Sequence, residues 1–312
     1  MVDEVLLNLS GFLTDQELYG TLSGNITDSA TTFTVTGSTF ADGSGFQPGL
    51  CEVGDELVYV GAVASGTGVF SNVIRGFNNT AGYAWLSGTT VRANPRVPTV
   101  AVVRALNHAI QALYPAVFVA GSSEVTAVAG QSGYELPATV DAVVAVRYEG
   151  PSATEAWIEP RSWRFDRKGP STSSTARLLQ VSGVPAGQKI QAITASPPSA
   201  LFTATTGAAA ETFTTVTGLP EWTAELVVLG ACYRLTGFLD AGRVASRTAE
   251  SDLLAQQSPT GVAAQLSEFY LGQHRALLEQ ARVRMLTEAL GVSPLEVGPP
   301  QQSAASREGG AQ

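Results

Sequence analysis

The chain has 312 residues, of which 44% are hydrophobic and only 14% are charged, and its formal net charge is −9. A chain of this length can bury about two or three cores, which predicts a globular protein. The acidic balance argues against readout of a nucleic-acid sequence, because that needs a basic surface. A monomer usually carries a more charged surface, so the low charge indicates a protein that partners largely cover.

Residues 1–22 predict a short helical lead-in, in which Thr14 or Asp15 would cap a turn at Gln16–Tyr19. Residues 1–74 contain no Lys or Arg but hold nine acidic residues. The simpler interpretation of this stretch is a solvated acidic face. The alternative is a wall that repels phosphate.

Residues 23–97 predict a small β sandwich or barrel. Polar and apolar residues alternate in Thr32–Thr36, Glu56–Val60 and Val69–Ile74, and glycines mark the turns between these segments. Within this region, Asp55-Glu56 is interpreted as a turn residue followed by an outward strand residue.

Three aromatic residues, Phe77, Tyr83 and Trp85, lie near the end of this β module. We expect them to pack the end of the module. The alternative is a platform that binds a sugar, for which one exposed aromatic residue would need a companion.

Helices alternate with β segments in the rest of the chain. Pro98 suits the first position of a helix over residues 98–116, and a second β-rich region follows over residues 117–218. Residues 219–291 predict a helical pair, with helices from Glu221 to about Ser246 and from Pro259 to Leu290. Residues 292–312 have the composition of an extended or disordered tail.

The predicted fold class is therefore α+β: a small helical bundle from discontinuous segments, with two β-rich insertions and an extended C-terminal tail. The helical stripes are too apolar to stay in water, so they should meet in one bundle. Its predicted core consists of Val103, Leu106, Ile110, Leu229, Tyr233, Leu266, Tyr270, Leu277 and Met285.

The sequence offers little chemistry. Cys51 and Cys232 are predicted to be buried thiols without a disulfide, and His108 and His274 to be structural residues within helices. No nucleophile, phosphate-loop or zinc pattern occurs, so we expect no enzyme activity, no cofactor and no metal. The N-terminus shows no export signal, which predicts a soluble protein made inside the cell.

Three stretches carry a resemblance. The first combines Glu56-Leu-Val-Tyr-Val60 with Val73-Ile-Arg-Gly-Phe-Asn-Asn-Thr-Ala-Gly82 and Gly88-Thr-Thr-Val91. The second is Ala105-Leu-Asn-His-Ala-Ile-Gln-Ala-Leu-Tyr-Pro115, and the third is the helix pair with Leu229-Gly-Ala-Cys-Tyr-Arg-Leu235, Arg243, Ser258-Pro-Thr and Tyr270 to Arg284. Together they resemble the head-to-tail adaptor (connector) proteins of long-tailed double-stranded DNA bacteriophages. Where the family pattern often has a His, this chain has Trp85.

The resemblance implies a virion structural protein at the neck of the portal vertex, assembled in the host cytoplasm. Such adaptors form a ring with themselves, usually of twelve copies. They dock below the portal protein, extend the DNA channel without sequence-specific binding, and join the stopper or tail-completion protein. It also implies that the tail reaches the portal, for which the candidate contacts are Pro294, Leu295, Val297, Pro299, Pro300 and Arg307.

Two other functions remain open at this stage. One is a capsid- or tail-surface protein whose β domains bind a receptor or glycan. The other is a hydrolase hidden in the β region, which the missing nucleophile and base disfavour.

Overall fold

A computed structural model describes residues 1–10, 18–37, 48–64, 66–150, 157–167, 177–201, 212–246 and 262–291. The chain divides into two compact units. The first unit comprises Met1–Pro115 and Pro198–Leu278, and the second comprises Ala116–Pro197 and Glu279–Gln312. Helices, a six-stranded barrel and two further sheets confirm the predicted α+β class.

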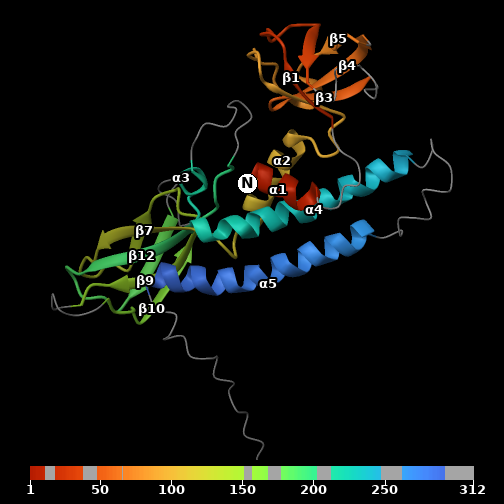
Figure 1. Cartoon of the computed structure of the whole chain (residues 1–312). Coiled ribbons are helices and arrows are strands. Elements are labelled where there is room, and N and C mark those ends of the chain that lie inside the picture. The colour runs from red at the N-terminus through yellow and green to blue at the C-terminus, as the bar shows by residue number, and fades with distance from the viewer. Residues whose placement is uncertain are drawn as a thin grey trace, which may run out of the picture. The chain divides into compact units, whose positions relative to one another are not determined.

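The first unit contains a closed antiparallel barrel, drawn in red to orange in Figure 1. Its strands pair in the order β1-β2-β5-β4-β3-β6, and β6 closes the barrel by pairing with β1. Phe33 and Phe70 stack inside it with ring centroids 5.2 Å apart. The strands and the short 3-10 turn between β5 and β6 are β1 (Leu18–Leu22), β2 (Phe33–Thr36), β3 (Gly49–Val53), β4 (Glu56–Ala64), β5 (Val69–Ile74), η1 (Phe77–Asn79) and β6 (Thr90–Ala93).

The predicted helical lead-in is partly wrong. A helix, α1, covers Val2–Ser10, but Leu18 and Tyr19 belong to strand β1, where they pair with Ala93 and Arg92 of β6. Residues 18–22 therefore form a strand that buries alternate side chains in the barrel core. They do not continue the helical turn that the proposed cap would have started. Thr14 and Asp15 lie outside the described residues.

The helices of the first unit surround α4. Helix α2 packs along α4, and α1 packs on both α4 and α2. Pro98 is the residue that caps α2 and does not occupy its first helical position. The helical elements are α2 (Thr99–Ala112), α3 (Phe213–Thr217), η2 (Glu221–Thr223), α4 (Ala224–Ser246) and α5 (Val262–Leu290), of which α5 belongs to the first unit as far as Leu278.

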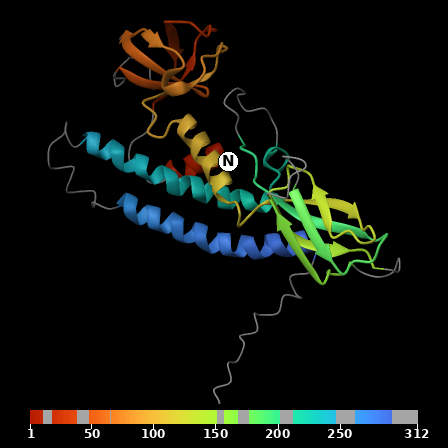
Figure 2. The same ribbon diagram turned by 180° about the vertical axis from the view of Figure 1, so that it is seen from behind.

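The second unit holds two three-stranded antiparallel sheets, drawn in yellow-green and green in Figure 2. One sheet has the order β10-β11-β8 and the other β7-β12-β9. Leu179, Ile190 and Ala192 are among the buried residues of their common core. The strands are β7 (Val119–Thr126), β8 (Gly133–Leu136), β9 (Ala142–Tyr148), β10 (Ser162–Asp166), β11 (Arg177–Ser182) and β12 (Lys189–Ser196).

Candidate functional site

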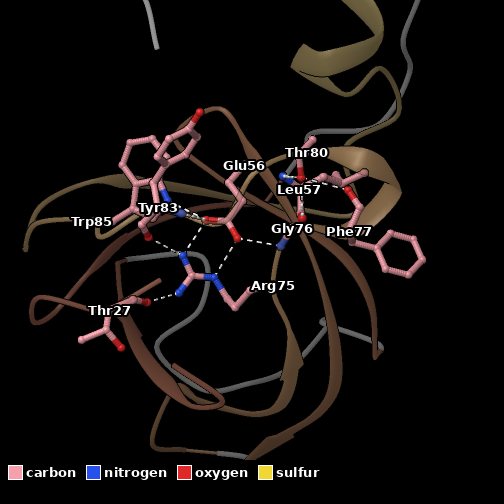
Figure 3. A network of polar contacts seen from close by, with 9 residues as sticks. All are labelled: Thr27, Glu56, Leu57, Arg75, Gly76, Phe77, Thr80, Tyr83 and Trp85. Carbon is pink, nitrogen blue, oxygen red and sulfur yellow. Dashed lines mark hydrogen bonds and ion pairs between the residues drawn. The ribbon is translucent and has the colours of Figure 1, made fainter. Parts of the chain in front are cut away.

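A buried ion pair holds the loop that follows β5 against the barrel (Figure 3). Glu56, at the start of β4, has no exposed side-chain area, and Arg75 is 7% exposed. Arg75 donates from Nε to Glu56 Oε1 at 2.8 Å and from Nη2 to Oε2 at 2.5 Å. The same carboxylate accepts from Gly76 N at 2.9 Å, Tyr83 N at 3.2 Å and Trp85 Nε1 at 2.9 Å. We call these residues the Glu56 lock.

The guanidinium of the Glu56 lock also binds two backbone carbonyl oxygens, one of them in a further loop. Arg75 Nη1 donates to the carbonyl oxygen of Thr27, and Nη2 donates to that of Tyr83 at 2.6 Å. The indole of Trp85 covers the turn between β3 and β4, where an added Cβ on Gly54 would lie 2.6 Å from the ring. The lock thus fixes residues 75–85 in one conformation.

The electrostatics of the lock favour an ionised carboxylate. Burial acts to raise the pKa of Glu56, but hydrogen bonds from Arg75, Gly76, Trp85 and Tyr83 outweigh it, and the pKa is lowered. A carboxylate that is fully buried and held by five donated hydrogen bonds cannot reach a substrate. The chemistry of this site is therefore structural.

This result corrects two sequence interpretations. Glu56 does not point outward, because the loop from Arg75 to Trp85 folds over it. Glu52 is also buried, at 1% exposed, so neither residue belongs to a solvated acidic face. The lone Arg75 after a long stretch without basic residues was the signal that could have suggested an internal ion pair.

A second buried carboxylate connects the barrel to α2. Glu52 of β3 accepts from Arg92 Nη1 at 2.7 Å and from the backbone N–H of Thr99, the first residue of α2, at 2.6 Å. A carboxylate at a helix N-terminus accepts a hydrogen bond from an otherwise unpaired backbone N–H. Its negative charge also interacts favourably with the positive end of the helix dipole. Burial nevertheless raises the pKa of Glu52, although Arg92 and Thr99 act to lower it.

The three aromatic residues at the end of the β module lie in different places. Tyr83 and Trp85 contact each other edge to face, with centroids 6.0 Å apart, beside the Glu56 lock. Phe77 is 37% exposed and lies 5.8 Å from the ring of Tyr59. Trp85 is thus part of the barrel's internal packing.

Helix α4 is buried around its whole circumference along Leu226–Cys232. At Gly230, an added Cβ would lie 3.2 Å from Ala109 Cβ of α2 and 3.1 Å from His274 Nε2 of α5. Glycine therefore suits a close approach of these helices, because a Cβ at this position would require its neighbours to shift by a few tenths of an ångström.

The predicted bundle-core residues have different environments. Val103 and Leu277 are half-buried, and Tyr233 is 36% exposed, so Tyr233 is not a core residue. Tyr233 lies just beyond Leu226–Cys232, where α4 begins to expose one side at Tyr233 and Arg234. The buried members are Leu106, Ile110, Leu229, Leu266 and Tyr270 in the first unit, and Met285 in the second.

Both cysteines are free and buried, as predicted. Burial raises the pKa of Cys51 and of Cys232 to about 12, so neither forms a thiolate near neutral pH.

Tyr270 donates from its hydroxyl to the carbonyl oxygen of Asn8 at 3.1 Å, which fastens α1 to α5.

His274 gives the helical core a pH dependence. Burial, assisted by the charge of Arg234, lowers the pKa of His274 below its ordinary 6.5. The unfolded chain therefore binds a proton at this histidine more readily than the folded chain. The unfolding free energy should fall as the pH drops below about 6.5, by up to about 1.4 kcal/mol per pH unit.

We expect His274→Gln to remove this fall in the unfolding free energy between pH 7.5 and 5.5, measured by denaturant unfolding. The exposed His108 provides the control, since His108→Gln should keep it; an unchanged slope in His274→Gln would contradict the assignment.

Helix α5 also presents an exposed face that could contact another molecule. Phe269 is 54% exposed, and Gly272 and Ala276, one and two turns further along the same face, are exposed as well. No atom lies within 4 Å of the Cβ position of Gly272. The face thus offers a large aromatic side chain beside two small exposed residues, and we call it the Phe269 face.

Among the described residues, no group of three or more His, Cys, Asp or Glu side chains could hold a metal ion, and no helix is long and apolar enough to cross a membrane. The six candidate portal contacts, Pro294, Leu295, Val297, Pro299, Pro300 and Arg307, lie outside the residues that the structure describes.

Residues 83–283, about two thirds of the chain, match the model of the SU10 adaptor protein family. The chain belongs to the SU10 adaptor family. It is a head-to-tail adaptor of a virion, as the sequence resemblance indicated, and the receptor- or glycan-binding alternative is not favoured. The family is one of structural adaptors and not of enzymes. The match begins at Tyr83, in the Glu56 lock, so five of the six barrel strands precede it.

No protein of curated function matches the adaptor. One solved structure, described as "Neck of empty GTA particle computed with C6 symmetry", is 15% identical over 55% of this chain and 77% of its own, with a TM-score of 0.20. A likeness at that score supports no argument about this chain.

Proposed function

We propose that this adaptor forms a closed ring of twelve copies that docks below the portal protein in the neck of the particle. The ring extends the DNA channel on one side and receives the stopper or tail-completion protein on the other. Family membership supports the adaptor role, and the observation that carries the ring is the Phe269 face. An exposed apolar helix face on a sparsely charged chain suits a contact with a different surface of the next copy, which is the geometry that closes a ring.

The channel passes DNA without reading its sequence. The chain's net charge of −9 opposes tight binding of phosphate. Asp3, Glu4, Asp28 and Asp55 are exposed, whereas Glu52 and Glu56 are paired inside the barrel and add nothing to such a surface. The proposed role requires no catalysis, no cofactor and no membrane.

The tail supplies the contact with the portal. Pro294, Leu295, Val297, Pro299 and Pro300 are apolar residues that an extended segment can place in pockets, and Arg307 can pair with a carboxylate. A segment that orders only on docking makes attachment conditional on meeting the portal.

Truncation after Gly291 tests this proposal. The truncated protein should remain folded and form rings, because the helices and sheets of the described residues are kept. It should fail to join portal-bearing heads in a reconstitution followed by sedimentation and negative-stain images. A deletion of Ser303–Gln312 alone, which removes Arg307 but keeps the prolines, provides a matched comparison. Truncated protein that completes heads at the normal rate would overturn the role of the tail.

A further inference from the structure

A row of polar side chains crosses one sheet of the second unit. Arg147 of β9, Gln191 of β12 and Glu124 of β7 are neighbours in register. Arg147 Nε donates to Gln191 Oε1 at 2.7 Å, and Gln191 Nε2 donates to Glu124 Oε1 at 3.3 Å. The two contacts fix the guanidinium of Arg147 over the sheet.

The fixed guanidinium meets the end of α5. Arg147 Nη1 donates to the carbonyl oxygen of Leu290, the last residue of the helix, at 3.5 Å. A cation is favoured there because the unpaired carbonyls of a helix end carry partial negative charge. Gly291 follows with φ +66°, and its N–H donates to the carbonyl oxygen of Glu288 at 3.2 Å. The chain therefore continues into the tail from a defined point beside Arg147.

An exposed apolar surface lies at the same point. The guanidinium carbon of Arg147 is 4.9 Å from the ring centroid of Trp157, which is 39% exposed. Ile158, beside it, is 36% exposed and is held to Tyr148 by backbone hydrogen bonds of 2.8 and 2.9 Å. Trp157 is thus anchored on one side and open on another.

We propose that Trp157 and Ile158 bind residues 292–300 of the same chain. At about 3.3–3.6 Å per extended residue, Pro294 starts within about 11 Å of Gly291 and Pro300 within about 32 Å. The segment Val292–Pro300 contains three prolines with Leu295 and Val297, and proline-rich segments dock on aromatic surfaces. Its one charged residue, Glu296, is complementary to Arg147.

The short tether makes even a weak contact effective. A connection of only a few residues gives an effective concentration of about millimolar, so no high affinity is required. The contact deepens the proposed function and rests on it for one point: the residues held at Trp157 are those that contact the portal. Before assembly, the contact with Trp157 keeps the tail from engaging other partners. Docking at the portal would then release residues 292–300 from Trp157.

The test compares tryptophan emission of the free full-length protein with that of protein truncated after Gly291. The full chain should emit at shorter wavelength, because the tail shields Trp157 from water. The shift should be lost in Trp157→Phe and kept in Trp163→Phe, with circular dichroism showing that both variants fold. It should also be lost when Pro294, Leu295 and Val297 are changed to Ser in the full-length chain.

Three outcomes would overturn the inference. These are the absence of a shift, a shift that survives Trp157→Phe, and a shift that grows with protein concentration, which would assign the bound segment to another copy. None of these measurements involves the portal. A negative result here therefore leaves the proposed portal contact standing, and failure of that contact in the truncation assay leaves this one standing.

Discussion

The Glu56→Gln variant is expected to lose about 3–5 kcal/mol of unfolding free energy, because it leaves the buried guanidinium of Arg75 without its counter-charge. The amide would also turn an N–H toward the donors of Arg75, where the carboxylate accepted hydrogen bonds. Chemical denaturation followed by the fluorescence of Trp85, whose indole donates to Glu56, measures the loss.

Asp55→Asn is the matched control, because Asp55 is the adjacent residue and is exposed. It should change the unfolding free energy by no more than about 0.5 kcal/mol. Replacing Glu56 and Arg75 together with Met should recover part of the loss, since no unpaired charge then remains. Equal stability of Glu56→Gln and Asp55→Asn would show that the lock does not stabilise the barrel.

The same pair gives the barrel an acid dependence. The folded pKa of Glu56 lies below its ordinary 4.5, so its contribution is complete above that pH and is lost as the pH falls through the folded pKa. Glu52 has the opposite sign, because burial raises its pKa above 4.5. Its ionisation in the folded state therefore costs stability at neutral pH, and this cost disappears on acidification.

Local patterns in the sequence were sufficient for the elements that bury one face. Strand β2 follows the predicted alternation, with Phe33 and Val35 buried, and helix α2 buries Leu106 and Ile110 of its predicted apolar stripe. The start of β1 at Leu18 was missed because its partner, β6, lies more than 70 residues away in the sequence. When a strand's partner is so distant in the sequence, the residues of a short strand show no pattern that predicts the pairing.

The Glu56 lock was missed for a related reason. In β4 the first three residues are all buried, which breaks the alternation, because the loop from Arg75 to Trp85 covers the outward side. A period of two describes a strand with one covered face, and it fails wherever a distant loop covers the other. Tyr233 was assigned to the core with the other apolar residues of the predicted helix, although it lies just beyond Leu226–Cys232, the part of α4 that is buried on all sides.

The second large effect concerns assembly. We expect Phe269→Asp to abolish ring formation while leaving the subunit folded, because a carboxylate on the Phe269 face would be buried without a counter-charge in the contact between copies. The side chain is 54% exposed in the single chain, so its replacement should change the unfolding free energy by about 0.5–1 kcal/mol at most. Analytical ultracentrifugation and negative-stain images measure the loss of rings.

A carboxylate elsewhere on α5 separates a specific contact from a general charge effect. Ala264 is also exposed and lies about 140° around the helix from Phe269, so Ala264→Asp adds the same charge to a different face and should keep the rings. Leu266→Asp is the opposite control: Leu266 is 8% exposed, and a charge there should unfold the subunit before assembly is reached. Because Ala264, Leu266 and Phe269 lie within six residues of one another on α5, the three variants separate folding from association on a single helix. Rings that persist in Phe269→Asp would mean that the copies meet through another surface.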